Sequence, residues 1–134
     1  MELTLAQLQE MGTSGLPGLI GIDFYEAGEG YVLARLELGE MHMAPNGYLH
    51  AGTVVTLADS ACGYGSILNL ADGATGFTTI ELKTNFLRSA QTGTIACEAR
   101  LVHGGRTTQL WDATVTDADG RTMALFRCTQ LMLR

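Results

Sequence analysis

Residues 46–59 read Asn46-Gly-Tyr-Leu-His50-Ala-Gly-Thr-Val-Val-Thr-Leu-Ala-Asp59 and run into an apolar segment that continues to about Leu70. The stretch opens on an Asn-Gly turn signal, and beyond the histidine it has almost no polar face, which predicts a helix buried on most sides. Asp59 lies in the middle of this helix. A desolvated carboxylate costs several kcal/mol unless it is paired or protonated, so Asp59 is a candidate functional residue.

The spacing between His50 and Asp59 carries a second prediction. Nine positions on one helix correspond to about 13.5 Å of rise and about 180° of rotation. The two side chains of one chain therefore cannot meet at one small substrate. If both serve the same chemistry, they come from two chains packed about a two-fold axis, which predicts a homodimer.

Length and composition predict a single domain, residues 1–134, that buries a substantial core. Hydrophobic residues make up 46% of the chain and charged residues 16%, as in an ordered globular protein. The sequence has no apolar run of transmembrane length and no basic start followed by an apolar region. We therefore expect a cytoplasmic protein without a membrane partner.

The charge is unevenly distributed. The net charge of −6 argues against a nucleic-acid partner. Residues 1–72 hold nine acidic residues and one basic residue, whereas residues 73–134 hold five acidic and seven basic residues. An anionic ligand is expected to bind the second half, although solvated strand faces also explain these cations.

The chain has an odd number of cysteines, with no CxxC motif and no metal-ligand spacing: Cys62, Cys97 and Cys128. All three lie in apolar stretches, which predicts buried, reduced thiols. Neither a metal nor a cofactor is indicated.

Much of the remaining chain alternates between apolar and polar residues, as β-strands do. We expect a short amphipathic helix over residues 3–11 and a long helix over 50–70. Period-two alternation and tight turns predict strands over 20–25, 31–38, 79–86, 95–103, 106–117 and 121–133, the last four as a meander. The fold class is therefore α+β: a single antiparallel sheet of about six strands, covered by one long central helix.

Four segments, residues 46–52, 57–59, 84–88 and 103–106, together resemble the hotdog-fold thioesterases of the phenylacetic-acid-degradation (PaaI-like) type, in register over roughly 20–133. The resemblance implies a sheet wrapped around the central helix, a homodimer joined edge to edge and further paired into a homotetramer, and a site at the subunit interface. It implies hydrolysis of an acyl- or aryl-coenzyme A. The chain departs from the family in having Ala51 after the histidine, where glycine is frequent, and Ala44 where the family commonly has asparagine or glutamine.

By resemblance, Asp59 is the nucleophile or the general base. A carboxylate bonded to Thr56 or Ser60, or capping a helix start, is the alternative. First-turn N–H groups of a helix bind an oxyanion readily, and by resemblance Ala51 supplies that donor, with Gly52 close by.

Other residues are expected around these. His50 orients this first turn or simply caps the helix. Thr79 aligns with a hydroxyl near the attacking water; alternatively it is a solvated strand residue on one face with Glu81, Lys83 and Asn85. The residues expected to contact substrate are Asn46, Asn85, Arg88, Gly105 and Arg106. The last two form a hairpin turn that the resemblance places near the nucleotide, where Arg106 and Arg88 pair with phosphates.

Two other functions compete with thioester hydrolysis. A hotdog hydratase or dehydratase also needs acid and base residues at a dimer interface, but water addition to an enoyl thioester usually uses a histidine and a carboxylate as a working pair. A non-catalytic acyl-CoA-binding module would not need Asp59 in its central helix.

Overall fold

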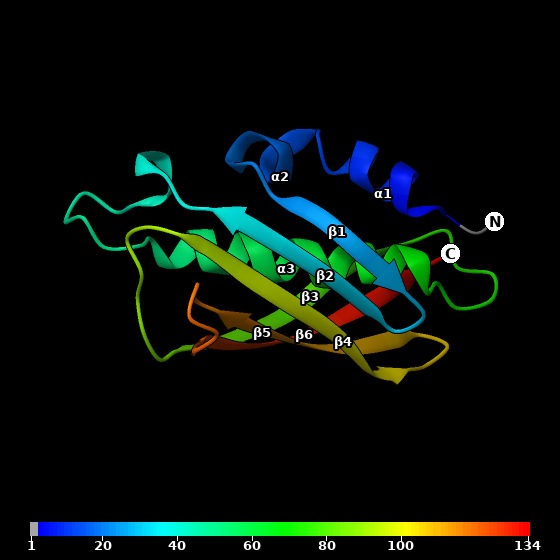
Figure 1. Cartoon of the computed structure of the whole chain (residues 1–134). Helices are drawn as coiled ribbons and strands as arrows, with labels where there is room; N and C mark the ends of the chain where they lie inside the picture. Colours follow the sequence, from blue (N-terminus) through cyan, green and yellow to red (C-terminus); the bar gives the residue numbers. More distant parts are fainter. Residues whose placement is uncertain (1–2) are drawn as a thin grey trace.

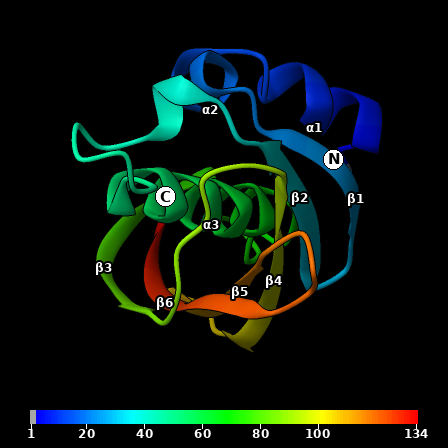
Figure 2. The same cartoon turned by 60° about the vertical axis from the view of Figure 1, so that its left-hand side comes forward.

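The computed structural model describes residues 3–134. A six-stranded sheet curls around one long helix, α3 (Ala51–Leu68), which lies in the hollow of the sheet (Figure 1 and Figure 2). Two short helices, α1 (Leu5–Met11) and α2 (Gly15–Ile20), precede the first strand, and a 3-10 turn, η1 (Glu40–His42), precedes α3. The strands are β1 (Asp23–Gly28), β2 (Tyr31–Glu37), β3 (Gly76–Phe86), β4 (Thr94–Gly104), β5 (Thr108–Thr116) and β6 (Thr122–Leu133).

The strand order is β1-β2-β4-β5-β6-β3, and all neighbours are antiparallel. The predicted single antiparallel sheet around a central helix is confirmed. The predicted four-strand meander is wrong, because β3 pairs with β6 at one edge while β2 lies beside β4. Residues 87–93 are therefore no hairpin turn. They pass the start of α3, where Gln91 Nε2 donates to the carbonyl of Gly47 at 3.1 Å.

Helix α3 is buried because small side chains let the sheet approach it closely. Leu57, Ala58, Ala61 and Cys62 are completely buried. A Cβ atom on Gly65 would lie 2.4 Å from the ring of Trp111 on β5, so this position needs a glycine. The sequence predicted this helix correctly, and its residues form the centre of the core.

The N-terminal region differs from the prediction in one element. Helix α1 is present, capped by Thr4, and the strand expected from residue 20 is instead α2 up to Ile20, followed by β1. Pro17 is tolerated in α2 because the first turn of a helix needs no N–H donor there. Gly21, at φ +87°, ends the helix.

Strand β3 is an edge strand with an irregular register. Thr79 pairs with Gln130 and Glu81 with Thr129, so Ile80 forms a bulge between them. Apolar side chains on this edge are exposed, 56% for Ile80 and 42% for Leu82. An exposed apolar edge strand is a ready site for pairing with another chain.

The three cysteines are buried and free, as expected. Burial raises the pKa of the Cys97 thiol to about 12. Within residues 3–134, no helix is both long enough and apolar enough to cross a membrane.

Candidate active site

Asp59 lies near the middle of α3 and is partly buried. Burial raises the pKa of its carboxyl above the ordinary value, and the nearby Thr79 hydroxyl acts in the opposite direction. The expected alternative partner Thr56 is engaged elsewhere, because its hydroxyl donates to the carbonyl of Gly52 at 2.7 Å. Within residues 3–134, the Thr79 hydroxyl is the one side-chain group at hydrogen-bond distance from the Asp59 carboxylate, which lies inside a mainly apolar helix. This favours a chemical role over local capping.

Thr79 of β3 reaches both Asp59 and a residue that the sequence reasoning missed. Its Oγ1 lies 3.4 Å from Asp59 Oδ1 and 2.6 Å from Oε1 of Gln130 on β6. Gln130 is completely buried. It occupies the inward-facing phase of β6 together with Phe126 and Cys128, and a polar residue in that apolar phase was the signal that could have identified it.

The bulge at Ile80 decides which way Thr79 points. The expected alternative, in which Thr79 shares a face with Glu81, Lys83 and Asn85, is wrong because the register shift reverses the alternation. Thr79 faces α3 together with the inward residues of β6. Bulges commonly re-aim a side chain beside an active site.

The start of α3 offers one backbone donor. The ring Nδ1 of His50 accepts the N–H of Gly52 at 2.7 Å, and the carbonyl of His50 accepts the N–H of Thr53 at 2.9 Å. The N–H of Ala51 has no acceptor among residues 3–134. Of the two expected oxyanion donors, Ala51 is therefore the available one, while His50 caps the helix.

A hydrogen-bonded loop holds this first turn in place. The buried His42 ring accepts the N–H of Gly39 at Nδ1, so its Nε2–H donates to the carbonyl of Ile20 at 2.7 Å. The carbonyl of His42 accepts the N–H of His50 at 3.0 Å. Asn46 is used locally, since its Oδ1 accepts the N–H of Tyr48 at 3.2 Å.

Ala51 lines a shallow cleft. Its walls come from the start of α3 and from the end of β3 and the following loop: Leu49, Ala51, Val54, Phe86, Leu87, Arg88 and Ser89. Arg88 thus brings a cation next to the available donor. This placement suits an anionic ligand with an apolar portion.

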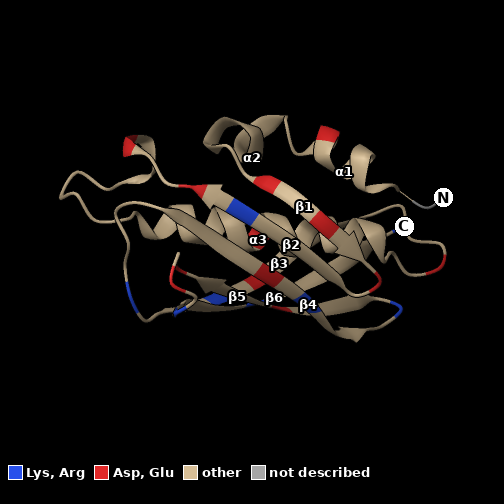
Figure 3. Ribbon diagram, in the orientation of Figure 1, with Lys and Arg blue, Asp and Glu red and all other residues tan. Residues whose placement is uncertain are grey.

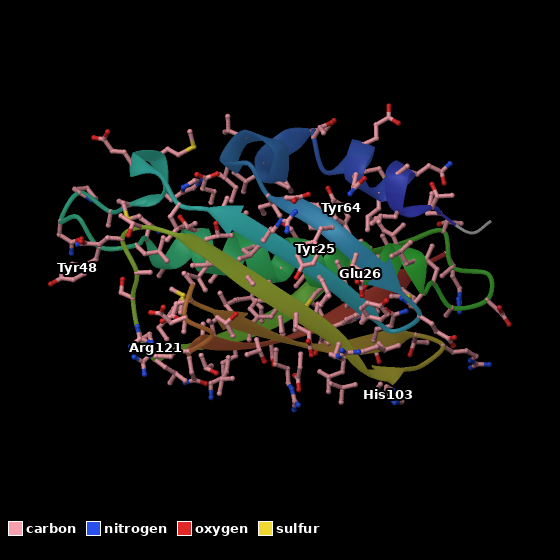
Figure 4. All side chains as sticks on the ribbon, in the orientation of Figure 1. Tyr25, Glu26, Tyr48, Tyr64, His103 and Arg121 are labelled. Atoms are coloured by element: carbon pink, nitrogen blue, oxygen red, sulfur yellow. The ribbon has the colours of Figure 1, made fainter. Side chains whose placement is uncertain are left out.

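The other expected contact residues lie away from this cleft within one chain. Asn85 is on the outer face of the sheet, in a depression that it shares with Lys83 and Arg127. Gly105 and Arg106 follow β4, close to His103. Figure 4 shows His103 at the opposite end of the molecule from Tyr48, which precedes α3.

The charges follow the division seen in the sequence. Acidic residues predominate over the N-terminal helices, β1 and η1, whereas most lysines and arginines lie on the strands of the sheet and in its loops (Figure 3). Within the described residues 3–134, no three His, Cys, Asp or Glu side chains are grouped so that they could hold a metal ion.

One chain thus holds two parts of a possible catalytic site, at two separate places. Asp59 with Thr79 is eight positions along α3 from Ala51, a distance of about 12 Å. A reacting carbonyl contacts its attacking group and its oxyanion donors within about 3 Å of each. These two parts of one chain therefore cannot act on the same carbonyl.

Comparison with known proteins gives consistent results. The family model described as the thioesterase superfamily matches residues 46–124. The chain is 33% identical over 115 residues to the 1,4-dihydroxy-2-naphthoyl-CoA hydrolase of Listeria monocytogenes, which covers 86% of this chain and 93% of that protein. It is 28% identical over 132 residues to the protein of the same name from Escherichia coli, covering 98% and 96% of the two chains. The crystal structure of a mutant thioesterase from Pseudomonas aeruginosa superposes with a TM-score of 0.92 at 28% identity, over 99% of this chain and 96% of that chain.

Proposed function

Because the chain belongs to the thioesterase superfamily, and is therefore an enzyme that hydrolyses thioesters, we propose that it cleaves an acyl- or aryl-coenzyme A with Asp59 as its catalytic carboxylate. The observation that carries the proposal is the placement of Asp59, a partly buried carboxylate of raised pKa beside the Thr79 hydroxyl. Such a group reacts readily because its ionised form is poorly solvated.

The proposed chemistry uses both parts of the site. Asp59 attacks the carbonyl carbon itself, or it takes a proton from the water that attacks. The carbonyl oxygen becomes negative and accepts the N–H of Ala51, where the positive end of the α3 dipole adds to the stabilisation. The C–S bond then breaks, and the coenzyme A thiolate leaves and takes up a proton.

Two chains are needed to assemble this site. Asp59 lies level with Thr79 on β3, and Ala51 lies level with Phe86. Edge-to-edge pairing of β3 with its copy, about a two-fold axis close to Leu82, would bring Asp59 of one subunit beside Ala51 of the other. Leu82 lies about midway between Thr79 and Phe86 along the strand. One two-fold axis near Leu82 would therefore both pair the two β3 strands and bring Asp59 beside Ala51 of the other subunit.

The relatives bear on the substrate. Two of them are named for the hydrolysis of an aromatic acyl-CoA, 1,4-dihydroxy-2-naphthoyl-CoA. We therefore place aryl-CoA esters first among the candidate substrates. Arg88 beside the Ala51 cleft supplies a cation for the phosphates of coenzyme A, and Arg106 could supply another from the partner subunit.

A hydratase whose histidine–carboxylate pair lies within one chain is disfavoured by the positions of His42 and His50. His50 is nine positions from Asp59, and its Nδ1 is bonded to the Gly52 N–H. His42 is buried and bonded at both ring nitrogens. Neither can form the histidine–carboxylate pair with Asp59 of the same chain.

Thiol release from a panel of aryl-, short-chain and long-chain acyl-CoAs tests the proposal. Wild type should turn over at least one class, and Asp59→Ala and Asp59→Asn should each lower kcat/KM on the order of a hundredfold or more. Asp72→Asn, an exposed carboxylate in the α3–β3 connection, is the matched control and should keep wild-type activity. A folded Asp59→Ala variant as active as the control would exclude Asp59 from the chemistry.

A further inference from the structure

Thr79 stands between a carboxylate and an amide, and its hydroxyl has one proton to donate. The distance from Thr79 Oγ1 to Gln130 Oε1 is 2.6 Å, whereas the distance to Asp59 Oδ1 is 3.4 Å. The proton therefore lies in the short bond to Gln130. The lone pairs of Thr79 remain free to accept a hydrogen bond on the side that does not face Gln130.

Gln130 is fixed so that its oxygen accepts this proton. It is the cross-strand partner of Thr79 in the β3–β6 pair, and its exposed fraction is 0%. Its Nε2 donates to Cys128 Sγ at 3.5 Å, which leaves Oε1 for Thr79. A buried amide oxygen without a donor would lose the free energy of its hydration, so the Thr79 bond is strongly favoured.

We propose that Gln130 is a positioning residue of the hydrolytic step, which rests on the proposed thioesterase function. By accepting the Thr79 proton, Gln130 makes Thr79 a hydrogen-bond acceptor for the attacking water. The water gives one hydrogen bond to Asp59 and one to Thr79, and one of its two lone pairs points toward the thioester carbonyl. Asp59 then acts as a general base, because the water rather than the carboxylate forms the new bond to carbon.

The proton balance of this step is complete. As the water oxygen bonds to the carbonyl carbon, its proton passes to Asp59, and its second hydrogen stays as the hydroxyl of the product acid. The electrons of the broken C–S bond leave on sulfur, and the thiolate takes the proton back from Asp59. Thr79 and Gln130 exchange no proton, since they only orient the water.

A second buried glutamine provides a matched control. Gln109 on β5 is 1% exposed, its Nε2 donates to the carbonyl of Asn69 at 2.6 Å, and its Oε1 accepts Trp111 Nε1 at 2.9 Å. These bonds join β5 to the end of α3 and involve neither Asp59 nor Thr79. Gln109→Met should therefore disturb the core as much as Gln130→Met without disturbing the water.

The first test is a double-mutant cycle on kcat and KM. Gln130→Met should lower kcat on the order of tenfold with little change in KM, and Gln109→Met should leave both near wild type. In a Thr79→Val background, Gln130→Met should have no further effect, because its target hydroxyl is absent. If Gln130→Met lowers kcat equally in both backgrounds, Gln130 does not act through Thr79 and the proposal is wrong.

The second test follows the Asp59 carboxyl by NMR titration and requires no turnover. Gln130→Met frees the Thr79 proton to bond with Asp59, so the pKa of Asp59 should fall. When Gln130→Met is added to Thr79→Val, the pKa of Asp59 should not change, because the hydroxyl is absent. The neighbouring Cys62 thiol stays neutral in this range, because its bond with Cys128 and its burial hold its pKa well above the ordinary value. An unchanged Asp59 pKa in Gln130→Met would overturn the inference. A wild type that releases no thiol, with the titration still as expected, would instead overturn the proposed function.

Discussion

The ring Nδ1 of His50 accepts the N–H of Gly52 at 2.7 Å, so the histidine that precedes α3 is its N-cap. His50→Ala should lower the free energy of unfolding by about 1 kcal/mol, and should lower kcat because the Ala51 donor becomes less ordered. His50→Asn retains a capping oxygen and should restore both. Urea unfolding and thiol release check the pair, and an Asn variant as inactive as the Ala variant would show that the imidazole itself takes part in the chemistry.

Asp59 should make the fold less stable at neutral pH. Burial raises the pKa of its carboxyl above 3.8, so the folded state holds the proton more tightly than the unfolded state does. The resulting stabilisation is fully present below the unfolded pKa and is lost as pH rises through the folded pKa. Asp59→Asn should therefore raise the midpoint temperature of unfolding by a few degrees near neutral pH, and by progressively less as pH falls toward 3.8. Thermal unfolding across pH, with Asp72→Asn as an unaffected control, measures this difference.

The sequence predicted the fold class because the central helix and the alternating strands carry strong periodic patterns. The resemblance to hotdog thioesterases is confirmed by the family match over residues 46–124, while the PaaI-like type stays a prediction. Strand partners could not be predicted, since alternation identifies a strand but not its neighbour. Helix α2 was missed because its glycines and Pro17 resemble a turn.

For the candidate site, Asp59 was identified by its polarity within an apolar helix. The direction of Thr79 was not predictable, because one extra residue at Ile80 reverses the alternation of β3 without any signal in composition. The availability of Ala51 depends on the His50 ring engaging Gly52, which is a matter of side-chain geometry. Gln130 was recognisable only after the inward phase of β6 was known.

Gly65 should tolerate no side chain. Its added Cβ would lie 2.4 Å from the ring of Trp111, so Gly65→Ala should lower the free energy of unfolding by about 1–3 kcal/mol despite the better helix propensity of alanine. The emission of the single tryptophan reports the disturbance directly. Gly63→Ala meets Phe77 at 3.0 Å on the edge strand and should be milder. If Gly65→Ala and Gly63→Ala lower the free energy of unfolding equally, the contact with Trp111 is no tighter than the contact with Phe77.

Leu82 should be required for the dimer, because it lies at the proposed two-fold axis on the edge strand. Leu82→Lys should give a monomer by sedimentation velocity, with activity falling together with association. Leu125→Lys is the control, since Leu125 is 49% exposed on the neighbouring strand but points to the outer face of the sheet. If only the Leu125 variant dissociates, the sheet joins its partner through that face instead.

Mixed dimers should reveal whether Asp59 and Ala51 act across the interface. Ala51→Pro removes the donor N–H while keeping a residue favoured at the first position of a helix, after His50 in an extended conformation that proline accepts. Alone, it should lower kcat by about a hundredfold or more. When it is mixed with Asp59→Ala, each mixed dimer contains one site with an intact Asp59 from one subunit and an intact Ala51 from the other. Equal mixing followed by subunit exchange should therefore restore about a quarter of wild-type activity. A site built from one chain would leave every site in the mixture with a defect, and no activity would return.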